Sequence, residues 1–365
     1  MPISRIGGYL ARYWREAFRS AMILIVLQAV VILILQAAAV RDSTINKPQN
    51  WIRRSGADVF VTLKGVRDYV SYSTVTPAEV QKIANLPNVE KVQGTILSFS
   101  SLGPDSITIQ SYDPSSGFGG PWSLTSKSHP ISDNGQVVVD RSLASELKLH
   151  LGSVISLGTG SFRVVGFSNG TSSIGKQLVF MTTADALKYL GQGGIFTHAL
   201  IKTANPELVS SLVSGFGVSA WTTKQFVAQN HNYWYKQIGP VQNQTVISSA
   251  LLGGLVLFVV LLFAAWMQRR TLAMQSALGV SPWRLICEEY ARTLVLCGVG
   301  FLLAILGSYA WIGSINHLTP GLDAELTARI FYQAIPLVAL MATLALIPSA
   351  VSMYRTDPAT ILREA

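Results

Sequence analysis

Four long apolar runs constrain the fold of this chain more than any other feature of its sequence. They cover residues 21–40, 246–266, 293–313 and about 330–351. Each holds about 20 residues, and an α-helix of that length, with a rise of about 1.5 Å per residue, crosses the ~30 Å hydrocarbon core of a bilayer. Only 13% of the residues are charged, against roughly 25% in typical soluble domains. The sequence therefore predicts a membrane protein with four transmembrane helices.

Basic residues beside these runs predict the orientation, because Lys and Arg accumulate in short cytoplasmic segments. They precede the first run, separate the second from the third and follow the fourth: Arg5, Arg12, Arg15, Arg19, Arg269, Arg270, Arg284, Arg292, Arg355 and Arg363. The loop between the third and fourth runs holds Asp323, Glu325 and a single basic residue, Arg329. We expect both termini and the loop 269–292 in the cytoplasm, and residues 41–245 outside.

The first apolar run also has features of a secretory signal. A basic segment precedes it, and the residues AAA at 37–39 fit an A-x-A cleavage site. Its apolar stretch of about 20 residues is nevertheless longer than the roughly 7 to 15 residues of a signal core. We therefore expect a retained transmembrane helix.

The net charge of +9 does not indicate nucleic-acid binding, because its distribution follows the membrane. Of the basic residues outside 41–245, all but one flank an apolar run, where the orientation rule places them. Within 41–245, 17 basic and 12 acidic residues are interspersed without a run. No nucleic-acid partner is expected.

The outer segment has the pattern of a folded α+β domain inserted between the first and second transmembrane helices. Two units of strand, helix and strand are expected, at 58–63, 76–87 and 89–100 near its start and at 197–203, 206–217 and 218–223 near its end. Such units pair in one open sheet with helices on one face. Between them, glycine-punctuated strands predict a β-rich insert at about 100–196. The segment contains no cysteine, so no disulfide is expected.

One phosphate-binding motif fits the sequence only in part. GTSSIGKQ at 170–177 matches G-x-x-x-x-G-K, but Gln177 replaces the Ser or Thr whose hydroxyl would bind Mg²⁺. A strand is expected after it, whereas the motif needs a helix whose N-terminal amides hold phosphate. It also lies in the outer segment, away from cytoplasmic ATP. We expect a glycine-rich hairpin turn and no directly bound cofactor.

Catalytic and metal-binding constellations are not expected, because the five histidines have no ligand spacing: His129, His150, His198, His231 and His317. His231 is a candidate for ligand contact together with Tyr233, Trp234 and Tyr235, although aromatic residues just before a span usually form an interface belt. Gln28 and Gln36 lie eight residues apart, on nearly one helix face. They are expected either to hydrogen-bond across a helix interface or to touch a substrate.

The sequence resembles the permease subunits of MacB/FtsX-type (type VII) ABC transporters, a family that includes MacB, the haem exporter HrtB and the lipoprotein-release permeases. The similarity covers nearly the whole chain. It is carried by residues 56–65 (GADVFVTLKG), 86–92 (LPNVEKV), 135–167, 269–285 (RRTLAMQSALGVSPWRL) and 354–364 (YRTDPATILRE). The resemblance implies five parts: residues 1–45 with the first helix, a MacB-like outer domain at 46–240, the second helix at 241–268, a coupling loop at 269–292, and the last two helices with the tail at 293–365.

The resemblance also implies a function for the loop between the second and third helices. In this family such a loop rests in a groove of a cytoplasmic ATPase. The residues expected to make that contact are Ala277, Leu278, Gly279, Val280, Ser281, Pro282, Trp283 and Ile286. The alternative from the residues themselves is an amphipathic helix at the lipid surface.

The implied assembly contains two permease copies in membrane lipid, two ATPase subunits that use ATP and Mg²⁺, and in some systems an extracytoplasmic adaptor. The chain itself is expected to be non-catalytic. Its expected function is export of an amphipathic or hydrophobic compound, such as haem, a drug, a peptide or a lipid-linked molecule, by movement of the outer domain. The alternative is an FtsX-like signalling permease, which activates an external enzyme without transport.

Overall fold

A computed structural model describes residues 3–103, 105–158, 160–171, 177–191, 193–318 and 324–332, together with 334–336, 339, 340, 343 and 347. Contacts divide the chain into two compact units. The first contains Met1–Arg41, Val241–Ser314 and Glu325–Ala365, and the second contains Asp42–Pro240 and Ile315–Ala324. We call them the helical unit and the outer domain.

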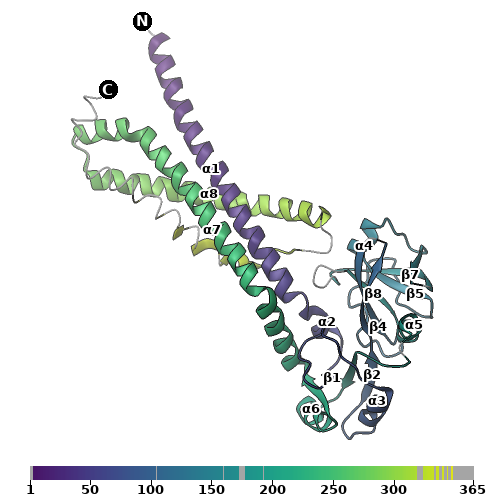
Figure 1. Cartoon of the computed structure of the whole chain (residues 1–365). Helices are drawn as coiled ribbons and strands as arrows, with labels where there is room; N and C mark the ends of the chain where they lie inside the picture. Colours follow the sequence, from purple (N-terminus) through teal and green to yellow (C-terminus); the bar gives the residue numbers. More distant parts are fainter. Residues whose placement is uncertain are drawn as a thin grey trace. The chain divides into compact units, whose positions relative to one another are not determined.

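Among the described residues, three helices are long and apolar enough to cross a membrane (Figure 1). They are α1 (Ile3–Asn46), α7 (Thr223–Ala277) and α8 (Pro282–Leu318). Their candidate spans are Ser20–Asn46, Thr223–Ala264 and Trp283–Asn316. Most of the fourth expected helix, 330–351, lies outside the described residues.

Small residues let the three helices approach closely within the helical unit. Val30 and Ile34 of α1 pack against Ala250 of α7. A Cβ added at Gly253 of α7 would collide with Val30, and one added at Gly300 of α8 would collide with Leu27 of α1. Helix association in lipid depends on such close packing, because burial away from water contributes little there.

The two strand–helix–strand units of the outer domain form one sheet, as expected, and its neighbouring strands are antiparallel. Its strand order is β10 (Val218–Thr222), β1 (Val59–Leu63), β9 (His198–Lys202) and β2 (Lys91–Thr95). Helices α3 (Pro77–Ala84) and α6 (Pro206–Ser214) cover one face with Ile83, Val209 and Val213. The capping box of Thr76 and Glu79 starts α3.

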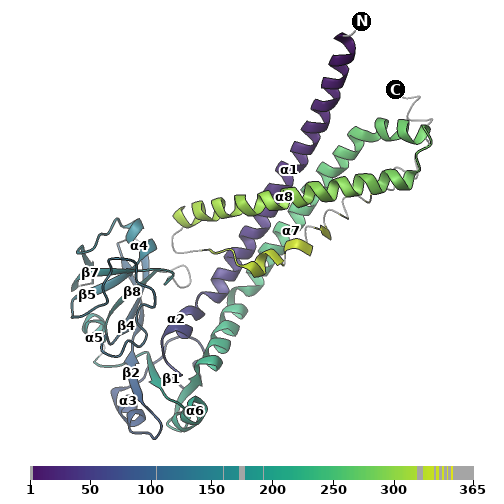
Figure 2. The same cartoon turned by 180° about the vertical axis from the view of Figure 1, so that it is seen from behind.

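The insert is a second sheet of six strands. Its order is β3 (Leu97–Leu102), β4 (Asp105–Tyr112), β8 (Gln177–Thr182), β5 (Gln136–Asp140), β7 (Gly160–Ser168) and β6 (Val154–Leu157). The pairs β4–β8 and β5–β7 are parallel. Helices α4 (Arg141–Glu146) and α5 (Thr183–Leu190) belong to this layer, seen from behind in Figure 2. The turn expected at 170–177 lies mostly outside the described residues.

The prediction of a single strand at 89–100 is wrong, because the structure splits this segment between the two sheets. β2 ends at Thr95 and β3 begins at Leu97. At the switch, the Ile96 amide donates to Ser111 Oγ (2.9 Å) and the Leu97 amide donates to Thr197 Oγ1 (2.8 Å). These partners are remote in sequence, so the alternating pattern could not reveal the break. The insert therefore begins at about residue 97.

An aromatic core joins the two sheets and the short helix α2 (Gln49–Arg54). Trp51 of α2 stacks on Tyr69 with ring centroids 4.5 Å apart and meets the edge of Phe60 at 5.7 Å. Phe226 at the start of α7 stacks on Phe60 at 4.9 Å. Phe180 of β8 belongs to the same cluster. This cluster thus connects the two sheets of the outer domain.

Candidate functional site

The turn between α7 and α8 is a tight helix end that depends on glycine. α7 ends at Ala277 and α8 begins at Pro282. Gly279 has a φ of +87°, a left-handed conformation that glycine adopts without steric cost. The Val280 amide donates to the Gln275 carbonyl (3.2 Å), the long-range bond of a Schellman helix end. Proline suits the first position of α8, because an N–H group at this position would have no hydrogen-bond partner within the helix.

Two large apolar side chains project from this turn. Leu278 is 83% exposed and Trp283 is 64% exposed. Nothing lies within 4 Å of the position that a Cβ would take at Gly279. Val280 is half-buried and Ser281 is exposed. The side chains of the other residues expected at this site lie outside the described part: Ala277, Pro282 and Ile286. Exposed aromatic and aliphatic side chains beside an open backbone are typical of a contact site.

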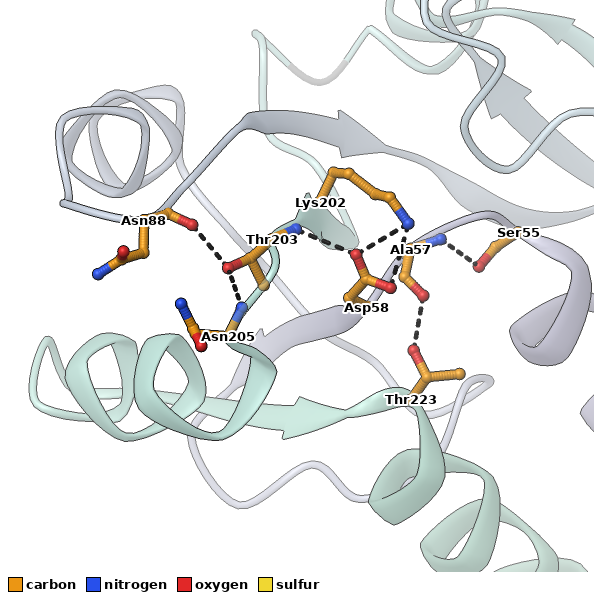
Figure 3. A network of polar contacts seen from close by, with 8 residues as sticks. All are labelled: Ser55, Ala57, Asp58, Asn88, Lys202, Thr203, Asn205 and Thr223. Carbon is orange, nitrogen blue, oxygen red and sulfur yellow. Dashed lines mark hydrogen bonds and ion pairs between the residues drawn. The ribbon is translucent and has the colours of Figure 1, made fainter.

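A second candidate site is the junction inside the outer domain where the chain passes from α2 into β1 and from β10 into α7 (Figure 3). The segment from α2 to β1 and the segment from β10 to α7 lie side by side there. The Thr223 amide donates to the Asp58 carbonyl (2.9 Å), and Thr223 Oγ1 donates to the Ala57 carbonyl (2.6 Å). The first residue of α7 is therefore bonded directly to the segment that leads from α2 into the sheet.

The carboxylate of Asp58 extends this junction to the neighbouring strand. It accepts from Lys202 Nζ at 3.0 Å and from the Thr203 amide at 3.0 Å. Thr203 Oγ1 donates to the Asn88 carbonyl (2.6 Å), and the Asn205 amide donates to Thr203 Oγ1 (3.0 Å). One polar network thus links the beginnings of β1 and α7 to the end of β9 and the segment before α6 (Figure 3).

Asn230 of α7 makes a further connection in the same part of the outer domain. It is fully buried. Its Oδ1 accepts from the Tyr69 amide (3.0 Å), and its Nδ2 donates to Gln49 Oε1 and to the Pro48 carbonyl (3.5 Å). Gln49 Nε2 in turn donates to the Ile45 carbonyl (2.7 Å). The break between α1 and α2 is therefore bonded to the first turns of α7.

Comparison with known families decides the identity of the chain. A family profile for the MacB-like periplasmic core domain matches residues 21–215, and one for the FtsX-like permease C-terminal region matches residues 243–358. The chain is a MacB/FtsX-type ABC permease. Membership implies that this permease associates with a cytoplasmic ABC ATPase and is the membrane subunit of the transporter. No curated protein sequence matches it significantly.

Solved structures similar to the permease each cover somewhat less than half of it. The periplasmic region of MacB from Actinobacillus actinomycetemcomitans is 14% identical, with a TM-score of 0.36 over 47% of the permease and 92% of that chain. The extracellular domain of the ABC-type transporter YknZ from Gram-positive bacteria is 10% identical (TM-score 0.33; 46% and 100% covered). A domain of a permease protein from Porphyromonas gingivalis is 15% identical (TM-score 0.30; 46% and 89% covered).

The remaining candidate site residues of the permease lie on two helices, α7 and α1. His231 stacks on Tyr235 with centroids 6.2 Å apart, and Tyr233 meets Trp234 edge to face at 5.5 Å, all on α7 within the outer domain. No group of three metal-ligating side chains occurs in the part of the chain that the structure describes. These aromatic contacts are local to one helix, so they assemble no pocket by themselves.

Gln28 and Gln36 lie on α1 in the helical unit, and both are half-buried. Gln36 Oε1 accepts from Trp311 Nε1 of α8 at 2.8 Å. This is an interhelical hydrogen bond, the first of the two roles considered for Gln36. Neither role is established for Gln28, so both remain predictions.

The residues that sequence reasoning missed are Asp58, Thr223 and Asn230. Each is a polar residue at an element boundary or on the buried side of a helix. Asn230 is four residues after the buried Phe226, so helical spacing alone places it on the inner face of α7. That signal indicates burial, but it does not identify partners about 160 or more residues away.

Proposed function

We propose that this permease is the membrane subunit of an exporter that extrudes an amphipathic or hydrophobic compound by mechanotransmission. In this mechanism ATP binding and hydrolysis by two partner ATPase subunits move two permease copies, and the helices carry that movement to the outer domains. Both termini and the turn at 277–286 are cytoplasmic in this arrangement. The proposal extends to an extracytoplasmic adaptor, which would receive the compound outside the membrane.

The observation that carries the proposal is the junction of the outer domain. Because Thr223 and Asn230 of α7 are bonded to the segments around Asp58 and Gln49, α7 and the end of α1 cannot shift independently of the sheet without breaking several hydrogen bonds. A buried donor or acceptor that is left without its partner costs about 1–3 kcal/mol of stability. A displacement of these helices is therefore expected to move the sheet with them.

The composition of the spans also favours movement of the outer domain over an ion pathway. Residues 21–40, 246–266 and 293–313 contain no Asp, Glu, Lys, Arg or His. Charged residues within membrane spans normally mark ion or proton pathways. Their absence from these three segments fits a transporter that does not carry ions through its centre.

Reconstitution into proteoliposomes with the partner ATPase tests this function. If the permease is a transporter, ATP hydrolysis should rise when an amphipathic compound from a panel that includes haem is added. This compound should also accumulate on the side of the membrane opposite the ATPase. Stimulation only by an extracytoplasmic protein, with no compound moved, would instead establish the FtsX-like signalling function.

The permease purified without its partner is expected to hydrolyse no ATP. Its G-x-x-x-x-G-K segment lacks the Mg²⁺-binding hydroxyl at Gln177, and Gln177 begins strand β8 rather than a helix. A phosphate-release assay on the purified chain, with the assembled complex as the positive control, checks this. Hydrolysis by the chain alone that survives removal of contaminating ATPases would contradict the non-catalytic assignment.

A further inference from the structure

The β4–β5 loop, residues 113–135, is bonded to the insert sheet along its second half. The Thr125 amide donates to the Phe167 carbonyl (2.9 Å), and the His129 amide donates to the Val165 carbonyl (3.2 Å). Both carbonyls belong to β7, so this half of the loop runs beside that strand. The loop is therefore part of the insert and is expected to follow the movement of its sheet.

The first half of the same loop contacts α2. The Trp51 indole N–H donates to the Gly119 carbonyl (3.0 Å), and the Gly119 amide donates to the Ser55 carbonyl directly after α2 (2.9 Å). All three residues are buried. The guanidinium of Arg54 lies over the ring of Trp122, 5.9 Å from its centroid, in a cation–π contact. Helix α2 thus holds the loop by two buried hydrogen bonds and one exposed contact.

The close approach of the loop to α2 depends on glycine. Gly119 has a φ of +71°, and a Cβ at this position would lie 3.2 Å from Trp51 Cζ2 and 3.3 Å from Leu200 Cδ1. Gly117 has a similar φ of +73°, but nothing lies within 4 Å of the corresponding position. A larger residue at 119 would therefore press the loop away from α2, whereas one at 117 would strain only its own backbone.

Helix α2 is also bonded to both long helices. Gln49 Nε2 donates to the Ile45 carbonyl of α1 (2.7 Å), and Gln49 Oε1 accepts from Asn230 Nδ2 of α7. The first turn of α2 is therefore fixed to the helices, while Trp51 and Ser55 are fixed to the insert. This arrangement makes α2 a direct connection between the helices and the six-stranded sheet.

We propose that α2 makes the insert follow the movement of α1 and α7 during transport, with Trp51 as a positioning residue. This inference rests on the mechanotransmission proposed above and extends it from the four-stranded sheet to the insert. While Trp51 and Ser55 hold Gly119, the outer domain moves as one body. Without these bonds, the insert detaches from α2 when the helices move.

The distance between the two sheets tests this inference in the full permease, bound to its ATPase in nanodiscs. Spin labels are attached at Ser145→Cys on α4 and Ser211→Cys on α6, two exposed positions. The native cysteines are replaced by Cys287→Ser and Cys297→Ala, and excess unlabelled permease restricts the measurement to labels within one chain. The wild type is expected to give one narrow distance distribution with and without ATP.

Trp51→Phe removes the indole N–H but keeps an aromatic ring beside Tyr69. With ATP, the ratio of detached to attached insert should rise roughly fivefold, as the loss of one buried hydrogen bond predicts. Less compound should also be moved per ATP hydrolysed. Trp221→Phe is the matched control and should behave as wild type, because the Trp221 indole N–H donates to the Val66 carbonyl (3.2 Å) rather than to this loop.

Gly119→Ala tests the same attachment from the loop, without altering the aromatic core, and Gly117→Ala is its matched control. Only the first should detach the insert. Wild-type distances in both Trp51→Phe and Gly119→Ala, or unchanged transport per ATP despite detachment, would overturn the proposal. A wild-type complex that moves no compound would instead refute the export function, and the distances would still decide whether the insert follows α2.

Discussion

At the scale of single residues, His198 makes the stability of the outer domain depend on pH. It is 1% exposed, with its ring centroid 5.7 Å from that of Tyr69 and 6.4 Å from that of Phe226. Burial lowers the pKa of His198 from 6.5 to about 4. The unfolded chain therefore binds more protons than the folded chain between these pH values. The stabilising contribution is complete above about pH 6.5 and is lost as the pH falls towards 4.

Unfolding measured at pH 7.5 and pH 5 checks this effect of His198. The wild type is expected to lose about 2 kcal/mol of unfolding free energy over this interval, from one pKa shift of this size. His198→Phe keeps an aromatic ring in the cluster but cannot be protonated, so its stability should change much less. An equal loss in wild type and variant would show that other groups cause the pH dependence.

Residue identity and spacing predicted much of the local structure and little of the remote contacts. Glycine adopts a left-handed conformation readily and proline suits the first position of a helix, and the structure has a tight turn at Gly279 and a helix start at Pro282. Asp58 and Asn230 carried no comparable signal. Their importance lies in partners such as Lys202 and Tyr69, which only the folded chain brings near.

At the scale of elements, the outer domain is expected to fold without the membrane. Residues 46–240 contain both sheets and the three clusters of buried side chains that hold them together. Expressed alone, this segment should be soluble and should lose its secondary structure in a cooperative transition on heating, because it has its own buried cores. Circular dichroism during heating provides the measurement. An aggregated product, or one without a transition, would contradict this domain boundary.

The junction provides a second prediction at this scale. Thr223→Val removes the hydroxyl that donates to Ala57 and is expected to cost about 1 kcal/mol of stability, while loosening α7 from the segment before β1. Transport should fall while ATP hydrolysis continues. Thr245→Val is the matched control, because Thr245 lies on the same helix and its hydroxyl donates only to Val241 within that helix. Equal transport by both variants would show that the Thr223 hydrogen bond does not take part in coupling ATP hydrolysis to transport.

The elements themselves were predictable where local patterns determine them. Alternating apolar residues and helix caps placed the strand–helix–strand units, and the length of the apolar runs placed the three described spans. The break at Ile96 could not be predicted, because β2 and β3 read as one alternating strand. At the break, the Ile96 amide donates to Ser111 Oγ and the Leu97 amide donates to Thr197 Oγ1, and the two halves enter different sheets.

At the scale of the whole molecule, we propose that the turn between α7 and α8 couples the permease to its ATPase. Gly279→Trp places a bulky side chain at a backbone position with a φ of +87° and open surroundings, so it should block close approach. Trp283→Ala removes an exposed aromatic anchor and should cost roughly 2 kcal/mol of binding free energy if the tryptophan is a hot spot. Glu288→Gln is the control, since it alters only an exposed ion pair with Arg284.

Co-purification of the ATPase with each variant, alongside export in cells, tests this claim most directly. We expect Gly279→Trp and Trp283→Ala to recover less ATPase and to transport less, with normal membrane insertion and a folded outer domain, while Glu288→Gln behaves as wild type. A helix that merely lies on the lipid surface predicts a different result, because neither change would then affect the ATPase. Wild-type ATPase recovery and full transport in both turn variants would contradict the coupling mechanism.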